Sequence, residues 1–226
     1  MYLWKLMRIQ EQTGMRQNKD KSMNVIGITG GIGSGKSRVL QFMEQNCGAF
    51  VCQADFVASQ LQKPGKVCYD EIVRCFGEDV LCPDLQLDRK KLAQIVFADK
   101  DKLVRLNQIV HPQVKQEIRA LIEQEKSGGR KLFVIEAALL LEDHYDEICD
   151  ELWYIYTEEA IRIQRLKKQR GYSDEQIRAV FQNQSKEEVF RKYCSQVIDN
   201  SGAFENTSRQ VLAALEKISN SYGEVR

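Results

Sequence analysis

The chain has 226 residues, 43% of them hydrophobic, which is enough to bury the core of one α/β domain with room for an insertion. Its 33 basic and 32 acidic residues leave a net charge of +1, so no overall field attracts nucleic acid or an acidic membrane. The sequence contains no stretch of about 18 apolar residues that could span a bilayer. We therefore expect neither a nucleic-acid partner nor a membrane partner.

The seven cysteines include no Cys-x-x-Cys pair, and only two histidines, His111 and His144, could complete a mixed zinc site. Metal binding by cysteine is therefore not expected. Reduced, partly buried thiols fit this set better, and they imply a reducing compartment. We expect a cytoplasmic protein, either a monomer or a weak homo-oligomer.

Residues 1–22 differ from the rest of the chain. Lys5 and Arg8 interrupt their only apolar run, so the segment lacks the continuous apolar core of a signal peptide. Glu11 and Asp20 are also unusual in a transit peptide. We expect a loosely attached extension before the first strand.

A phosphate-binding loop is the most specific motif of the chain. Residues 30–37 read GGIGSGKS and match G-x-x-x-x-G-K-[ST] in full, between an expected strand at 24–29 and an expected helix at 37–45. Glycines let main-chain N–H groups close around phosphate oxygens, and the helix N-terminus faces the same anion. A glycine-rich turn that matches by chance is the alternative. We expect ATP phosphates to contact Gly31, Ile32, Gly33, Ser34, Gly35, Lys36 and Ser37, with Mg²⁺ on the Ser37 hydroxyl.

Asp55 follows the second expected strand, at residues 50–52. The carboxyl ends of parallel strands face the ligands of such sheets, so this carboxylate could accept the proton of an attacking hydroxyl. The alternative is an N-cap for a helix over residues 56–61, and one residue can serve both roles. We expect Asp55 to be catalytic.

Residues 66–122 carry no strong strand pattern and several amphipathic helical pieces. Asp88 is the expected N-cap of one of them. Two further pieces lie before and after His111-Pro112, where the pattern is interrupted. This region is expected to be a helical insertion.

Strand-type runs return at residues 131–135 and 152–156, and a weaker one begins at 196–198. Glu136 ends the first of these runs, where a carboxylate can bind Mg²⁺ directly or through water. An exposed acid at a strand end is the alternative interpretation of Glu136.

The segment between the last two runs is cationic and helical. A helix is expected from Thr157, as its cap, through Arg170, and a capping box at Ser173–Gln176 opens another. Such a pair could close as a lid over the γ-phosphate, although a solvated surface with ion pairs is the alternative. The lid interpretation is favoured because the phosphate loop precedes it.

Together these motifs resemble the dephospho-CoA kinase family. The similarity extends from about residue 23 to 210 and follows the family's order of motifs. It includes the phosphate loop, Ala54-Asp55, the Leu87-Asp88-Arg89 step, Val110-His111-Pro112, LLLE at 139–142 and VIDNSG at 197–202.

The resemblance implies a P-loop NTPase-type α/β fold, a parallel five-stranded sheet flanked by helices, with a helical substrate-binding insertion and a helical lid. We expect the nucleotide-binding core at residues 23–62, 127–156 and 196–226, the insertion at 63–126 and the lid at 157–195. The implied reaction is transfer of the ATP γ-phosphate to the ribose 3′-hydroxyl of dephospho-CoA.

The resemblance also distributes roles. Lys36 and Ser37 would hold phosphate and Mg²⁺, and Asp55 would be the base. Residues near the adenine would be Asn200 through Gly202, and the acceptor side would include Arg89, His111 and Leu139. In the lid, Arg165 keeps the family position and is expected to be the main phosphate contact, with Arg170 as an auxiliary.

Five residues depart from the family pattern. Gln53 stands where an Asp is usual, Ala138 where a Pro is usual, Gln169-Arg170 where Arg-Asp is common, and Ser195 where an Asp is frequent. Two other functions stay open, namely a different P-loop small-molecule kinase, such as a nucleoside monophosphate kinase, and a non-catalytic ATP-binding module.

Overall fold

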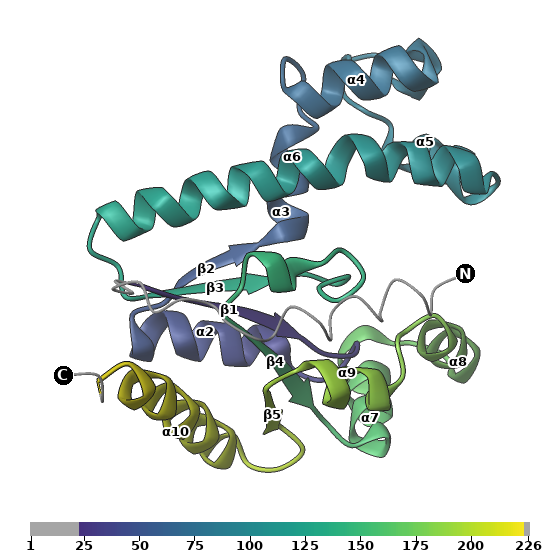
Figure 1. The fold of residues 1–226 in the computed structure, drawn as a ribbon. Helices are drawn as coiled ribbons and strands as arrows, with labels where there is room; N and C mark the ends of the chain where they lie inside the picture. The colour runs from purple at the N-terminus through teal and green to yellow at the C-terminus, as the bar shows by residue number, and fades with distance from the viewer. Residues whose placement is uncertain (1–22, 224–226) are drawn as a thin grey trace.

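A computed structural model describes residues 23–223, so the expectation for residues 1–22 falls outside the described part of the chain. At its centre is a parallel sheet in the order β2-β3-β1-β4-β5 (Figure 1). The predicted α/β class with five parallel strands is confirmed. The strands are β1 (Asn24–Thr29), β2 (Phe50–Gln53), β3 (Leu132–Glu136), β4 (Glu151–Tyr156) and β5 (Gln196–Asp199).

Helices cover both faces of the sheet, because successive strand residues point to opposite sides. One face packs against α2 (Lys36–Cys47) and α10 (Phe204–Gly223), and the other against α3 (Ala54–Leu61) and α6 (Lys100–Ser127) (Figure 1). On β3, Val134 belongs to the first of these cores, whereas Phe133 and Ile135 belong to the second. All three are fully buried.

The region between β2 and β3 is helical. It contains α3, α4 (Val67–Phe76), a 3₁₀ turn at Glu78–Val80, α5 (Arg89–Phe97) and α6. Both α4 and α5 lie toward the start of α6, away from the sheet (Figure 1). The predicted cap is confirmed, because the Asp88 carboxylate accepts a hydrogen bond from the Lys91 main-chain N–H.

The predicted break at His111-Pro112 is wrong, since α6 runs without interruption from Lys100 to Ser127 with Pro112 inside it. A proline inside a helix costs about 3 kcal/mol, because it removes a hydrogen bond and crowds the preceding turn. Burial of apolar side chains on both sides of the proline offsets this cost. The buried residues of α6 are Val110, Val114, Ile118 and Ile122.

Three α-helices lie between β4 and β5, namely α7 (Glu159–Arg170), α8 (Asp174–Gln182) and α9 (Glu187–Tyr193). The capping box at Ser173 and Gln176 is confirmed. The prediction that Thr157 caps α7 is wrong, because Glu158 takes that position. The Thr157 hydroxyl donates to the Ser34 carbonyl instead. The division into core, insertion and lid stays a prediction.

None of the described helices combines the length and apolarity needed to cross a membrane.

The α6 contact with the sheet supplies a stability prediction. Ile118 is fully buried in the core that α6 shares with the sheet, so Ile118→Ala should lower the free energy of unfolding by about 2–5 kcal/mol in urea titrations. Val104→Ala, on the 52% exposed side chain of the same helix, is the matched control and should change it by less than about 0.5 kcal/mol. Equal losses in both variants would contradict this packing.

Candidate active site

The phosphate loop, residues 30–37, leaves the end of β1 and enters α2. Several of its main-chain N–H groups form no hydrogen bond within residues 23–223, those of Gly33, Gly35, Lys36 and Ser37. They sit at the start of α2, where the helix dipole favours negative charge. The loop therefore has the donor groups of an anion site.

Two glycines of the loop lie close against neighbouring side chains. Gly35 has φ +83°, in the left-handed region, and a Cβ there would overlap the Asn200 side-chain amide. A Cβ on Gly31 would overlap the Arg162 guanidinium. Here the missing side chains make room for other parts of the protein as well as for a ligand.

The Lys36 side chain folds back onto the main chain of the phosphate loop. Its ammonium donates to the Gly30 carbonyl at 2.6 Å and lies 4.0 Å from the Glu136 carboxylate. Burial lowers its pKa below the usual range; the charges of Arg162 and Arg170 add to this, and that of Glu136 opposes it. The ammonium thus sits in a partly desolvated site, where its charge acts strongly on a nearby anion.

Two carboxylates act electrostatically on Lys36. Glu136 is the last residue of β3 and pairs in register with Gln53 of β2, two residues before Asp55. Burial raises the Glu136 pKa, Lys36 lowers it, and the charge of Asp55 raises it again, so the three groups interact electrostatically. The interpretation of Asp55 as an N-cap is wrong, because Gln53 caps α3 and the exposed Asp55 lies in its first turn.

These groups suit Mg²⁺ better than a metal held by protein alone. Within the described part of the chain, no group of three His, Cys, Asp or Glu side chains could hold a metal ion. Mg²⁺ is typically bound by one or two carboxylates together with substrate phosphates and water. Ser37, Asp55 and Glu136 offer oxygen atoms of this kind at the end of the sheet where the phosphate loop lies.

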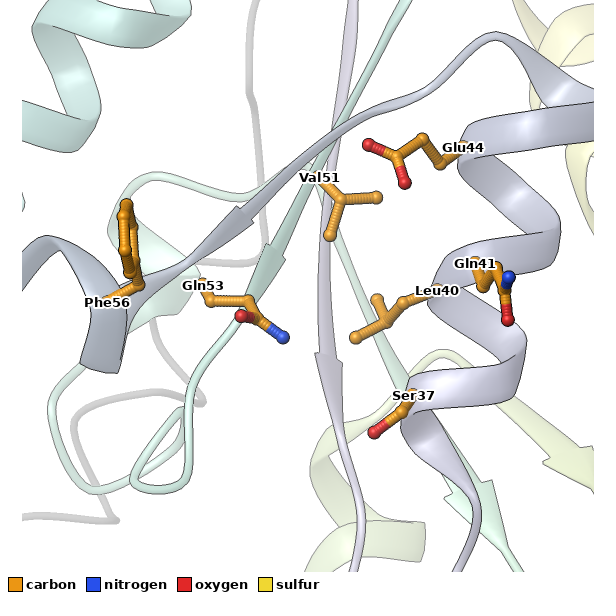
Figure 2. Close-up of a pocket in the computed structure, with 7 residues that line it drawn as sticks. All are labelled: Ser37, Leu40, Gln41, Glu44, Val51, Gln53 and Phe56. Atoms are coloured by element: carbon orange, nitrogen blue, oxygen red, sulfur yellow. The ribbon is translucent and has the colours of Figure 1, made fainter.

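A pocket of about 270 Å³ lies between α2 and the β2–α3 segment (Figure 2). Ser37 lines one end of it, and the Gln53 side chain points into it from β2. Glu44 is the carboxylate that lines this pocket, seven residues and so about 10.5 Å along α2 from Ser37. Glu44 is therefore too far from Ser37 to replace the carboxylate of the Asp that is usual in the family at position 53.

The Ser34 carbonyl is the most heavily bonded group of the loop. It accepts hydrogen bonds from the Asn200 amide at 2.7 Å, the Thr157 hydroxyl at 2.9 Å and the Arg165 guanidinium at 3.3 Å. Arg165 also donates to the Gly33 and Asn200 carbonyls. These bonds occupy Arg165, and its predicted contact with phosphate stays a prediction.

Two residues of the region between β4 and β5, which the sequence analysis did not single out, contact the loop at Ile32. The Arg162 guanidinium donates to the Ile32 carbonyl at 2.9 Å and to the Gln184 side-chain oxygen at 2.8 Å. That same Gln184 oxygen accepts from the Ile32 N–H at 3.3 Å. No motif predicts this contact, because Gln184 is 152 residues from Ile32 and lies between two helices.

The second candidate lid arginine is placed differently from the first. Arg170 is exposed at the end of α7, and it forms no ion pair or hydrogen bond within residues 23–223. Its charge nevertheless lowers the pKa of Lys36. Arg170 thus acts electrostatically on the phosphate loop with its donors uncommitted.

The residues expected on the acceptor side lie in separate elements. The His111 imidazole of α6 contacts the Asp143 carboxylate, with 2.9 Å between Nδ1 and Oδ1, in the loop between β3 and β4 that also carries Leu139. Leu139 is 46% exposed. Arg89 is exposed in the first turn of α5, and within residues 23–223 it forms no hydrogen bond or ion pair with the phosphate loop.

Asn200 and Gly202, expected near adenine, follow β5. Asn200 is buried, and its amide oxygen accepts from the Thr207 hydroxyl. Gly202 is exposed. The Asn200 side chain lies next to Gly35 of the phosphate loop, because a Cβ on Gly35 would meet the Asn200 amide.

Comparisons with known proteins agree with this geometry. The family model described as dephospho-CoA kinase matches residues 24–206. The chain is 38% identical over 193 residues to the dephospho-CoA kinase of Carboxydothermus hydrogenoformans. The matched segment covers 85% of this chain and 93% of that protein. It is also 38% identical over 193 residues to that of Thermobifida fusca, covering 85% and 95%.

Solved structures show the same fold. A Thermus thermophilus protein, TT1252, superimposes with a TM-score of 0.73 at 30% identity over 86% of this chain and 97% of its own. Dephospho-CoA kinase from Campylobacter jejuni superimposes with a TM-score of 0.66 at 22% identity over 88% and 98%. With the family model matching most of its length, this chain belongs to the dephospho-CoA kinase family.

Proposed function

We propose that this protein transfers the γ-phosphate of ATP to the ribose 3′-hydroxyl of dephospho-CoA and so forms coenzyme A. The observation that carries the proposal is the cluster of Lys36, Asp55 and Glu136 beside the uncommitted N–H groups of the phosphate loop. Family membership supports this reaction. A nucleoside monophosphate kinase or a silent ATP-binding module would not account for the similarity over the whole insertion and lid.

The roles of the loop residues follow from their positions. The N–H groups of Gly33, Gly35, Lys36 and Ser37 would bind the β- and γ-phosphates. The Lys36 ammonium would stabilise the charge of the transferring group. When bound, Mg²⁺ would neutralise phosphate charge, with the Ser37 hydroxyl and the Glu136 carboxylate as its protein ligands. Asp55 is exposed beside this cluster, where it could accept the proton of the 3′-hydroxyl.

The acceptor would enter between the phosphate loop and the helical region. His111 and Leu139 flank this side, since the contact between His111 and Asp143 joins α6 to the loop that carries Leu139. The exposed side chains of Phe56 and Leu139 offer apolar surface to the acceptor. Arg89 is proposed to meet acceptor phosphate, although it lies farther along the insertion.

An acceptor panel tests the reaction directly. Purified protein with ATP and Mg²⁺ should release ADP when dephospho-CoA is added, and it should release little with AMP, shikimate or gluconate. The acceptor pocket sets this preference, because the phosphate loop is common to many kinases. A coupled ADP assay measures it, and product mass distinguishes a 3′-phosphorylated acceptor from ATP hydrolysis. Equal release with AMP would indicate a different small-molecule kinase.

Asp55→Asn tests the proposed base. Asparagine keeps the shape of the side chain and removes its basic oxygen, so kcat should fall by roughly 10²- to 10⁴-fold while ATP affinity changes little. Stability should hold, because Asp55 is exposed and does not cap α3. Asp70→Asn, in the first turn of α4, is the control and should keep full activity. Normal kcat in Asp55→Asn would remove this role.

The two lid arginines can be separated by kinetics. We propose that Arg165 supports the loop through the Gly33 and Ser34 carbonyls in addition to its predicted phosphate contact, and that Arg170 approaches the phosphates from solvent. Arg170→Ala should lower kcat and kcat/KM together by roughly tenfold with an unchanged melting temperature. Arg165→Ala should lower all three quantities. An unchanged kcat in Arg170→Ala would leave Arg165 as the phosphate contact.

A further inference from the structure

The turn between α8 and α9 contacts both sides of the candidate active site. Its residue Gln184 bonds the phosphate loop at Ile32, as described above. The next residue, Ser185, donates its hydroxyl to the Glu142 carboxylate at 2.5 Å. Glu142 belongs to the loop between β3 and β4, on the acceptor side. Two adjacent lid residues thus join the ATP side to the acceptor side.

The Gln184 end of this connection is well defined. One side-chain oxygen accepts from two donors, the Ile32 N–H at 3.3 Å and the Arg162 guanidinium at 2.8 Å. The opposite orientation of the amide would bring an NH₂ group against both donors, so the hydrogen-bond network fixes it. Phe181 of α8 stacks on Arg162 with 4.3 Å from the guanidinium carbon to the ring centroid. Arg162 is thereby held between the loop and the lid.

The Ser185 end leads to the insertion. Next to Glu142, the Asp143 carboxylate contacts the His111 imidazole of α6 at 2.9 Å. A continuous set of contacts therefore runs from the phosphate loop through the turn to the helix of the insertion. The Ser185–Glu142 bond is short, as expected for a hydroxyl that donates to a carboxylate, and it is exposed to solvent. An exposed bond adds little to the stability of the protein. The bond can instead fix the position of the loop that carries Glu142.

We propose that Gln184 and Ser185 form a two-residue bridge that fixes the spacing between the phosphate loop and the acceptor loop. Both are positioning residues, since they act through Ile32 and Glu142 and not on a reacting atom. Phosphoryl transfer depends on the alignment of two bound reactants, so a loose bridge lowers kcat more than it weakens the binding of either substrate. This inference rests on the proposed kinase reaction.

The test uses Gln184→Met, which keeps the side-chain length and removes the acceptor, and Ser185→Ala, which removes the donor. Each should lower kcat by roughly tenfold, with both KM values within about threefold of wild type. The double variant should be no slower than either single one, because the two contacts act in series. Melting temperatures should stay within about 2 °C of wild type.

Two further variants complete the design. Gln184→Glu keeps an oxygen that accepts from Ile32 and Arg162, and it should retain at least about a third of the wild-type kcat. Gln182→Met, at the exposed last residue of α8, is the matched control and should behave as wild type.

Several outcomes would overturn the bridge. Wild-type kcat in either single variant would do so, as would losses that multiply to about a hundredfold in the double variant, because the contacts would then act separately. A kcat loss that follows a lower melting temperature would make the contacts purely structural. Wild-type protein that releases no ADP with dephospho-CoA would instead refute the proposed reaction, and this control is measured first.

Discussion

The Ser34 carbonyl is the point on which the geometry of the site depends. A phosphate loop turns its N–H groups toward a ligand, so its carbonyls face the protein and need donors there. Thr157, Arg165 and Asn200 supply three such donors from the end of β4, from α7 and from the end of β5. Because these donors come from separate segments, the loop keeps its shape only when the sheet and α7 are assembled.

This constraint explains why small residues recur in the loop. Gly35 makes room for the Asn200 amide and Gly31 for the Arg162 guanidinium, so both glycines serve close packing behind and beside the loop. A larger residue would push these partners away and free the carbonyls that they satisfy. The loop is thus shaped by the protein around it as much as by the anion it is built to bind.

Charge is balanced within the site itself. Burial disfavours both the Lys36 ammonium and the Glu136 carboxylate, and their mutual attraction partly offsets that cost. Asp55 adds a negative charge that is felt by both. A phosphate bound at Lys36 would add negative charge to the site. The positive charge of Arg170 in α7 would offset part of it, because Arg170 lies close enough to act electrostatically on Lys36. The same few charges therefore prepare the site for an anionic substrate.

The sequence alone determined the features that depend on local pattern. Apolar runs located all five strands, and glycine spacing located the phosphate loop, because both signals are carried by neighbouring residues. Local rules failed at Pro112 and Thr157, where burial along α6 and the Ser34 carbonyl decided the outcome. Only the tertiary structure could reveal the contacts of Gln184, since they join residues 152 positions apart through side chains that no spacing rule connects.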